Sequence, residues 1–154
     1  MISKSYHFYL FVLLPIVTGG FIYILFRSDE LLMFRWFKTI GIGRLIGTLR
    51  NIDFIKSAII PGWIRYSLPD GLWIFSYVSL MFLIWGNKIS KTSAIWIFIL
   101  PVIAVLSEFG QLFKVVPGTF DYYDLATYLF STLLPIILFK HIFTNLKTAP
   151  HDKI

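Results

Sequence analysis

Four long apolar runs divide the sequence, and most of the charged residues lie in the segments between them. A helix needs about 20 apolar residues to cross the hydrocarbon core of a bilayer, and each run approaches that length. We therefore predict an all-α integral membrane bundle of four transmembrane helices, forming a single domain over residues 1–154. A short turn at residues 87–93 and a polar tail from Thr144 complete the pattern. The predicted spans are residues 8–26, 71–86, 94–113 and 122–140.

Three of the apolar runs contain a proline, which predicts bends in the helices. Proline has no backbone N–H and cannot donate to the carbonyl four residues earlier. Pro15 should free the carbonyl of Phe11, and Pro135 that of Ser131. Pro101 should bend the third span near its middle.

The segment between the first two runs, residues 31–60, has a different pattern. From Ile42 to Ile59 apolar residues recur at helical spacing, while basic and polar residues fall largely on the other side. This pattern is typical of an amphipathic helix in the membrane interface, with its basic groups toward lipid phosphates. A tucked helix packed on the bundle is the alternative. Pro61-Gly62 is the predicted end of the segment.

Composition narrows the class of protein. Hydrophobic residues make up 57% of the chain and charged residues 14%, against roughly 25% in soluble domains. The net charge of +6 comes without a basic run or a base-stacking motif, so the expected partners are anionic lipid head groups and not nucleic acid. The chain has no cysteine, its histidines lie near the chain ends, and it has no Walker or dinucleotide motif. We expect no cofactor.

Acidic residues gather around the turn between the third and fourth runs. Glu108 and Gln111 lie one helical turn apart near the end of the third span, and Asp121 and Asp124 open the fourth. In a four-span bundle Asp70, at the start of the second span, comes to the same membrane face. Carboxylates at membrane depth are costly and usually mark a functional site. The sequence therefore predicts a carboxylate-lined pocket at one membrane face.

Residues that follow the acids along the helices extend this polar face. On the fourth span Asp124, Thr127, Tyr128 and Ser131 form one stripe, which adds Tyr128 to the predicted binding residues. Several alternatives stay open at this point. Asp124 can serve as a helix cap, Asp121 as a turn residue, and Glu108 can hold helices together by bonding Gln111. A hard cation held by the acids is also compatible with the ligand types, although we predict no metal site.

Buried carboxylates need a compensating cation, and the spans themselves contain no basic residue before Lys140. Arg65 lies five residues before Asp70, on the same membrane face as the acids. Its planar guanidinium suits a carboxylate partner. We predict that residues 61–70 fold over the turn as a lid and direct Arg65 toward Asp121, Asp124 or Glu108.

The acidic turn resembles the C-terminal signature of the VanZ-like family of small bacterial membrane proteins. The resemblance rests on Glu108-x-x-Gln111, followed by Pro117-Gly118-Thr119-Phe120-Asp121-x-x-Asp124-Leu125, and covers about residues 66–138. Asp70, with Phe75 five residues later, is similar to that family's opening of a span. The chain has different residues where the family tends to have Lys, His, Arg and Asn: Gly71, Ile74, Thr119 and Tyr128.

This resemblance implies a multi-pass protein of the bacterial cytoplasmic membrane, associated with the cell envelope or with glycopeptide resistance. It implies no settled reaction. We expect the pocket to bind a lipid-linked or glycopeptide-type ligand. The alternatives are a membrane enzyme that acts on a lipid head group by carboxylate acid–base chemistry, and a small proton- or ion-coupled transporter, which would require a homo-oligomer.

Overall fold

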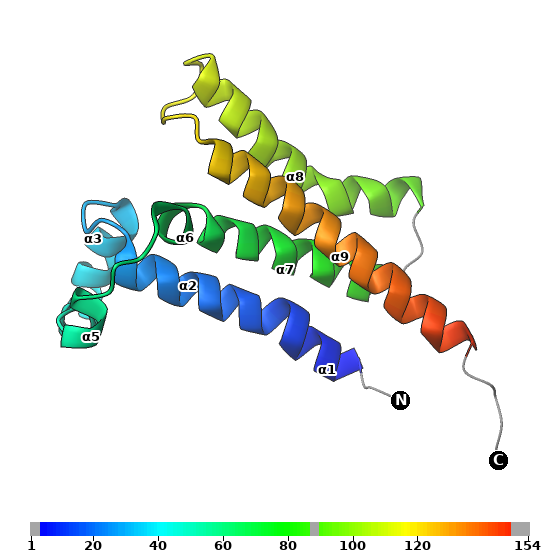
Figure 1. Cartoon of the computed structure of the whole chain (residues 1–154), viewed down its shortest axis with the longest axis horizontal. Helices are drawn as coiled ribbons and strands as arrows, with labels where there is room; N and C mark the ends of the chain where they lie inside the picture. Colours follow the sequence, from blue (N-terminus) through cyan, green and yellow to red (C-terminus); the bar gives the residue numbers. More distant parts are fainter. Residues whose placement is uncertain (1–3, 87–89, 149–154) are drawn as a thin grey trace.

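The computed structural model describes residues 4–86 and 90–148, apart from the side chains at positions 54, 56 and 141–148. Every regular element in this part of the chain is helical. Four helices are long and apolar enough to cross a membrane, which confirms the predicted number of spans, and they form the elongated body seen in Figure 1. These helices are Ser5–Phe26, Leu68–Trp85, Lys91–Leu112 and Tyr122–Lys140.

The first span is assembled from α1 (Lys4–Phe8), a π-helical turn η1 (Tyr9–Leu13) and α2 (Leu14–Phe26). The π-helical turn ends two residues before Pro15, which is buried. Because Pro15 has no N–H to offer the carbonyl of Phe11, the helix widens by one residue there. A bend was predicted at Pro15, and the structure has a π-helical turn just before it.

The second span, α7 (Leu68–Trp85), is the central helix of the bundle. It packs against α2, against α8 (Lys91–Leu112) and most extensively against α9 (Tyr122–Thr148). Phe82 and Phe139 stack with their ring centroids 5.7 Å apart, which ties the far ends of α7 and α9 together. The buried apolar core consists of Ile74, Val78, Phe82, Ile97, Tyr128 and Phe139.

Two glycines allow the closest helix contacts in the bundle. A Cβ atom on Gly71 would lie 2.1 Å from Cγ2 of Thr127 and 2.9 Å from Oγ of Ser131, so α7 and α9 meet at this point without any spare room. A Cβ atom on Gly19 would lie 2.9 Å from Nε1 of Trp73. Small residues commonly let membrane helices approach this closely.

The third span begins earlier than expected and bends as expected. Ser90 and Ser93 form a capping box, and α8 starts at Lys91, inside the turn predicted at residues 87–93. Residues 87–89 of that turn lie outside the described residues. α8 bends near its middle, in keeping with the buried Pro101 inside it (Figure 1). α9 continues to Thr148, so the predicted tail begins within a helix, and its last six residues are not described.

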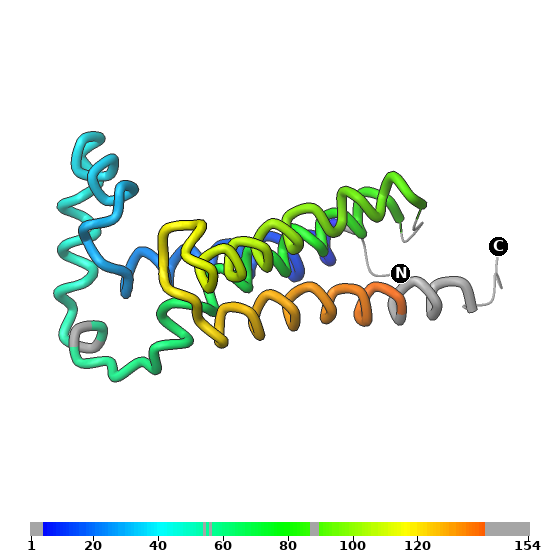
Figure 2. Tube along the Cα trace, turned by 90° about the horizontal axis from the view of Figure 1, so that it is seen from above, coloured from blue at the N-terminus to red at the C-terminus, as the bar shows by residue number. Residues whose placement is uncertain are grey.

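The segment between the first two spans differs from the single amphipathic helix predicted for it. It forms three short helices, α3 (Leu32–Thr39), α4 (Gly43–Arg50) and α5 (Asp53–Lys56), followed by α6 (Gly62–Tyr66). The predicted helix is interrupted at Ile52, which has an extended backbone between Asn51 and Asp53. Asn and Asp favour turns and caps because their side chains compete for backbone hydrogen bonds. Figures 1 and 2 place these short helices together at one end of the bundle.

Candidate functional site

The acidic turn joins α8 to α9 through the side chain of Glu108. Glu108 is buried, with 2% of its surface exposed, and its Oε2 accepts a hydrogen bond of 3.2 Å from the backbone N–H of Asp121. The carboxylate of Asp121 in turn accepts a 2.8 Å bond from the N–H of Tyr123, in the first turn of α9. Asp121 therefore caps α9, a role that the alternative interpretation gave to Asp124, while Glu108 faces the protein interior.

Asp70, in the first turn of α7, lies at the same end of the bundle as the acidic turn. It interacts electrostatically with both Glu108 and Asp124. Its carboxylate also lies 3.6 Å from the guanidinium of Arg27, at the end of α2. We call Arg27, Asp70, Glu108, Asp121 and Asp124 the charged cluster. It joins all four long helices at one end of the bundle.

Tyr128 borders the charged cluster from α9. Its side chain is buried and interacts electrostatically with Asp70, Asp124, Glu108 and Arg27. One turn earlier, Asp124 keeps its Oδ1 atom buried without a hydrogen-bond partner in the protein. Because buried polar atoms in proteins are almost always paired, such an atom calls for an explanation.

The cation beside the acids is Arg27, whereas the sequence pointed to Arg65. The guanidinium of Arg27 lies 5.1 Å from the ring centre of Tyr23 and 5.2 Å from that of Tyr66. Arg65 lies 5.9 Å from the Tyr66 ring, and among the described residues it forms no ion pair with an acid. α6 does pack against α2, α7 and α9, but this packing leaves the predicted Arg65 contacts unformed. Both arginines keep a buried Nε atom without a hydrogen-bond partner in the protein.

Gln111 supports the turn and has no hydrogen bond to the acids among the described residues. A Cβ atom on Gly118 would lie 2.7 Å from Cδ of Gln111, so the amide packs directly on the turn backbone. Gly118 has a φ of +137°, a conformation that favours glycine. The glycine in the VanZ-like signature is therefore explained here by its backbone conformation and by the packing of Gln111 against it.

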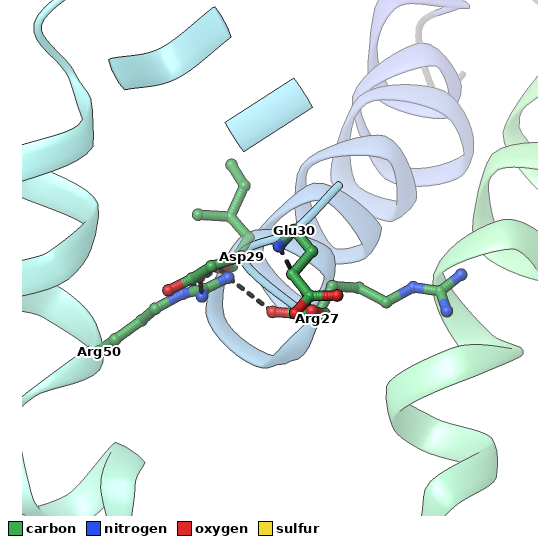
Figure 3. A network of polar contacts seen from close by, with 6 residues as sticks. Arg27, Asp29, Glu30 and Arg50 are labelled. Carbon is green, nitrogen blue, oxygen red and sulfur yellow. Dashed lines mark hydrogen bonds and ion pairs between the residues drawn. The ribbon is translucent and has the colours of Figure 1, made fainter. Parts of the chain in front are cut away.

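A second arginine, Arg50, fastens the short helices to the end of α2 (Figure 3). Its Nε donates to the carbonyl of Ile24 at 2.7 Å, and Nη2 donates to the carbonyl of Arg27 at 2.9 Å. Nη1 pairs with Asp29, and the guanidinium lies 4.5 Å from the ring centre of the buried Phe34. Burial lowers the pKa of Arg50 from its ordinary value, because the charged form loses contact with water.

We call these contacts of Arg50 the arginine clamp. A cation at a helix C-terminus satisfies the last carbonyls and interacts favourably with the helix dipole. The clamp also holds the backbone of Arg27, whose side chain points away from Arg50 in Figure 3 and toward the charged cluster. Neither Arg27 nor Arg50 was among the residues predicted from the sequence to form the site. Arg27 directly follows the first apolar run, at the same end of the predicted bundle as the acids. That position could have indicated Arg27 as a cation close to them.

An apolar groove runs beside the charged cluster along α7. Its volume is about 450 Å³, within the range of pockets that hold one small ligand. Thr127 and Ser131 line it, and they are the residues that a Cβ atom on Gly71, the neighbour of Asp70, would meet. From Trp63 and Tyr123 at the charged end, the groove reaches Pro15 and Leu134 near the middle of their spans. An amphiphile would find polar and apolar surfaces side by side here.

The described residues contain no group of three or more acids or histidines placed to hold a metal ion. No family model, curated protein or solved structure matches the chain. The resemblance to the VanZ-like family therefore stays a prediction that rests on the residues of the acidic turn.

Proposed function

We propose that this protein is a VanZ-like envelope protein of the bacterial cytoplasmic membrane that binds the polar head of a lipid-linked or glycopeptide-type ligand at the charged cluster. One observation carries the proposal. Three buried polar atoms of both charge types, Nε of Arg27, Nε of Arg65 and Oδ1 of Asp124, have no hydrogen-bond partner in the protein. Each such atom costs about 1–3 kcal/mol when it stays unpaired. A head group that carries both donors and acceptors would satisfy them.

The surroundings of the charged cluster support a ligand with an apolar part. Apart from Trp63, the residues that line the groove along α7 lie within the spans, and most are apolar, among them Leu68, Leu72 and Phe75. We further propose that α3 to α5 lie in the membrane interface at this end, so that the charged cluster is at head-group depth. A lipid-linked molecule could then reach the cluster laterally from the bilayer.

Ligand retention by the purified protein tests this function. The protein, extracted in mild detergent, is incubated with lipids of differing head groups, and the bound lipids are identified by native mass spectrometry. We expect a head-group preference that falls at least about tenfold in Glu108→Gln and Asp124→Asn, which corresponds to losing one charged hydrogen bond. Glu30→Gln is the matched control, because Glu30 is an exposed carboxylate at the same end of the bundle. Binding without head-group preference, unchanged by Glu108→Gln, would contradict the proposal.

A second candidate function, an enzyme that acts on a lipid head group, is favoured by Oδ1 of Asp124. This oxygen is buried and unpartnered in the protein, so it could accept a proton from a bound hydroxyl or water. The test is to incubate the protein with the lipids that it retains and to search by mass spectrometry for altered head groups. Conversion that disappears in Asp124→Asn, while retention and folding persist, would favour the enzyme. Unaltered lipids after long incubation would favour binding alone.

A further inference from the structure

A second pocket, separate from the charged cluster, lies where α3 turns into α4. Its volume is about 520 Å³, and its lining residues are Lys38, Gly41, Gly43 and Arg44. We propose that this basic pocket binds the phosphate of an anionic membrane lipid. The pocket shares no residue with the charged cluster, so this proposal does not depend on the proposed function.

The turn between the two helices is built so that both cations reach one place. Gly41 has a φ of +83°, a left-handed conformation that ends α3 and lets the chain begin α4 three residues after Ile40. A Cβ atom on Gly43 would lie 3.0 Å from Cγ of Lys38, so the stem of the lysine lies against the glycine backbone. Larger residues at these two positions would separate Lys38 from Arg44.

The charges of the basic pocket are not neutralised within the described part of the protein. The ion pairs found there are Arg27 with Asp70 and Arg50 with Asp29, and neither involves Lys38 or Arg44. The two side chains combine a compact ammonium with a planar guanidinium, and both groups bind phosphate oxygens well. The ligand chemistry that fits is therefore a phosphate anion.

The apolar surface around the pocket favours a lipid over a free phosphate. α3, α4 and the turn between them expose Trp36, Ile40 and Leu45, each with about 62–63% of its surface accessible. Phe34 and Ile46 are buried on the same helices and, with the arginine clamp, attach them to the protein. Exposed apolar residues beside unpaired cations, outside the spans of a membrane protein, are typical of a surface that enters the lipid interface.

The direction of α4 agrees with this placement. In Figure 2 the short helices at the end of the bundle, drawn in cyan, run across the long axis of the four long helices. If those helices cross the bilayer, α4 lies roughly in its plane. Lys38 and Arg44 then meet lipid phosphates while Trp36, Ile40 and Leu45 contact the upper parts of the acyl chains.

The experiment compares phosphatidylglycerol with phosphatidylcholine binding by native mass spectrometry of the full chain in detergent. Lys38→Gln combined with Arg44→Gln should lower phosphatidylglycerol binding about tenfold or more and leave phosphatidylcholine binding unchanged. The control is Lys91→Gln combined with Lys114→Gln, which removes the same charge from two exposed positions elsewhere. Lys38→Arg should keep most of the binding, since it preserves the cation.

Any of four results would overturn the proposal. The double variant could bind phosphatidylglycerol as the original protein does, or the control could lose as much binding, which would reveal general charge attraction. Inorganic phosphate at low millimolar concentration could displace the lipid completely, which would identify a free phosphate site. Hydrogen exchange of the original protein gives a test that needs no variant. Residues 36–46 should exchange more slowly with phosphatidylglycerol than with phosphatidylcholine, and equal rates would also contradict the proposal.

Discussion

Two arginines at the end of α2 have contrasting surroundings. Arg50, in the arginine clamp, has an acceptor for each of its three donor nitrogens: the carbonyls of Ile24 and Arg27 and the carboxylate of Asp29. Arg27, in the charged cluster, reaches Asp70 at 3.6 Å and keeps its buried Nε without a partner in the protein. The two residues are joined directly, because Arg50 binds the carbonyl of Arg27.

Arg50, with all its donor nitrogens paired, stabilises the fold, whereas Arg27, with an unpaired donor, is available to a ligand. A structural network in a membrane protein is stable when every buried donor and acceptor is paired, and the arginine clamp meets that condition. The charged cluster does not, since Arg27 and Asp124 each keep an unpaired buried atom. We therefore expect substitutions in the clamp to change stability, and substitutions in the cluster to change ligand binding.

Gly71→Ala should lower the free energy of unfolding more than any other substitution proposed here. Gly71 lies at the α7–α9 contact, on the side of the charged cluster and away from the arginine clamp. The added Cβ would lie 2.1 Å from Cγ2 of Thr127, and overpacking of this kind costs typically 1–3 kcal/mol. Unfolding by denaturant in detergent measures the loss. Thr127→Ser should restore part of it, and Gly20→Ala is the control, since a Cβ there meets nothing within 4 Å. Equal losses for Gly71→Ala and Gly20→Ala would show that the contact is not tight.

Arg50→Gln should destabilise the clamp by about 2 kcal/mol, the scale of hydrogen bonds to a charged group. The same substitution should speed hydrogen exchange at residues 24–50, because α3 and α4 lose their attachment to α2. Arg35→Gln serves as the control, since Arg35 is exposed on α3. If Arg50→Gln leaves stability unchanged, the clamp does not hold the fold and the comparison fails.

A double-mutant cycle between Arg27→Gln and Asp70→Asn should give a coupling of about 0.5–1 kcal/mol. The pair is partly exposed, with 24% and 28% of the two side-chain surfaces accessible, so solvent weakens it. The same cycle between Arg65→Gln and Glu108→Gln should be additive within about 0.5 kcal/mol, because no ion pair joins them in the described structure. Strong coupling of Arg65 with Glu108 would instead support the prediction from the sequence that Arg65 is the cation that pairs with the acids.

Asp124→Asn should change the free energy of unfolding least, by under about 0.5 kcal/mol. The substitution keeps the shape of the side chain and removes a charge that has no hydrogen-bond partner at Oδ1. It should nevertheless lower the head-group preference at least about tenfold, the loss of one charged hydrogen bond. A large loss of stability would instead place Asp124 among the structural residues, with Asp121.

The hydrophobic pattern was sufficient to predict four helices long and apolar enough to span a membrane, and to predict that the acids lie at one end of the bundle. Runs of about 20 apolar residues have few stable arrangements outside a bilayer, and span order alone brings Asp70, Glu108 and Asp124 to one end. Pro15 and Pro101 were informative for a similar reason, because a missing N–H acts locally. These features depend on the chain itself and not on which residues meet across the bundle.

Tertiary structure decided which cation meets the acids and how residues 31–60 are arranged. Arg27 and Arg65 both lie at the charged end, and their sequence distances from Asp70 do not predict which one reaches it. The close contact at Gly71 and the attachment of α3 and α4 by Arg50 set that geometry. Ile52 likewise fits a helical pattern, yet Asn51 and Asp53 on either side favour a break once the chain must fold back on the end of α2. Ion pairs and helix breaks of this kind follow from three-dimensional packing, which the periodicity of a sequence does not contain.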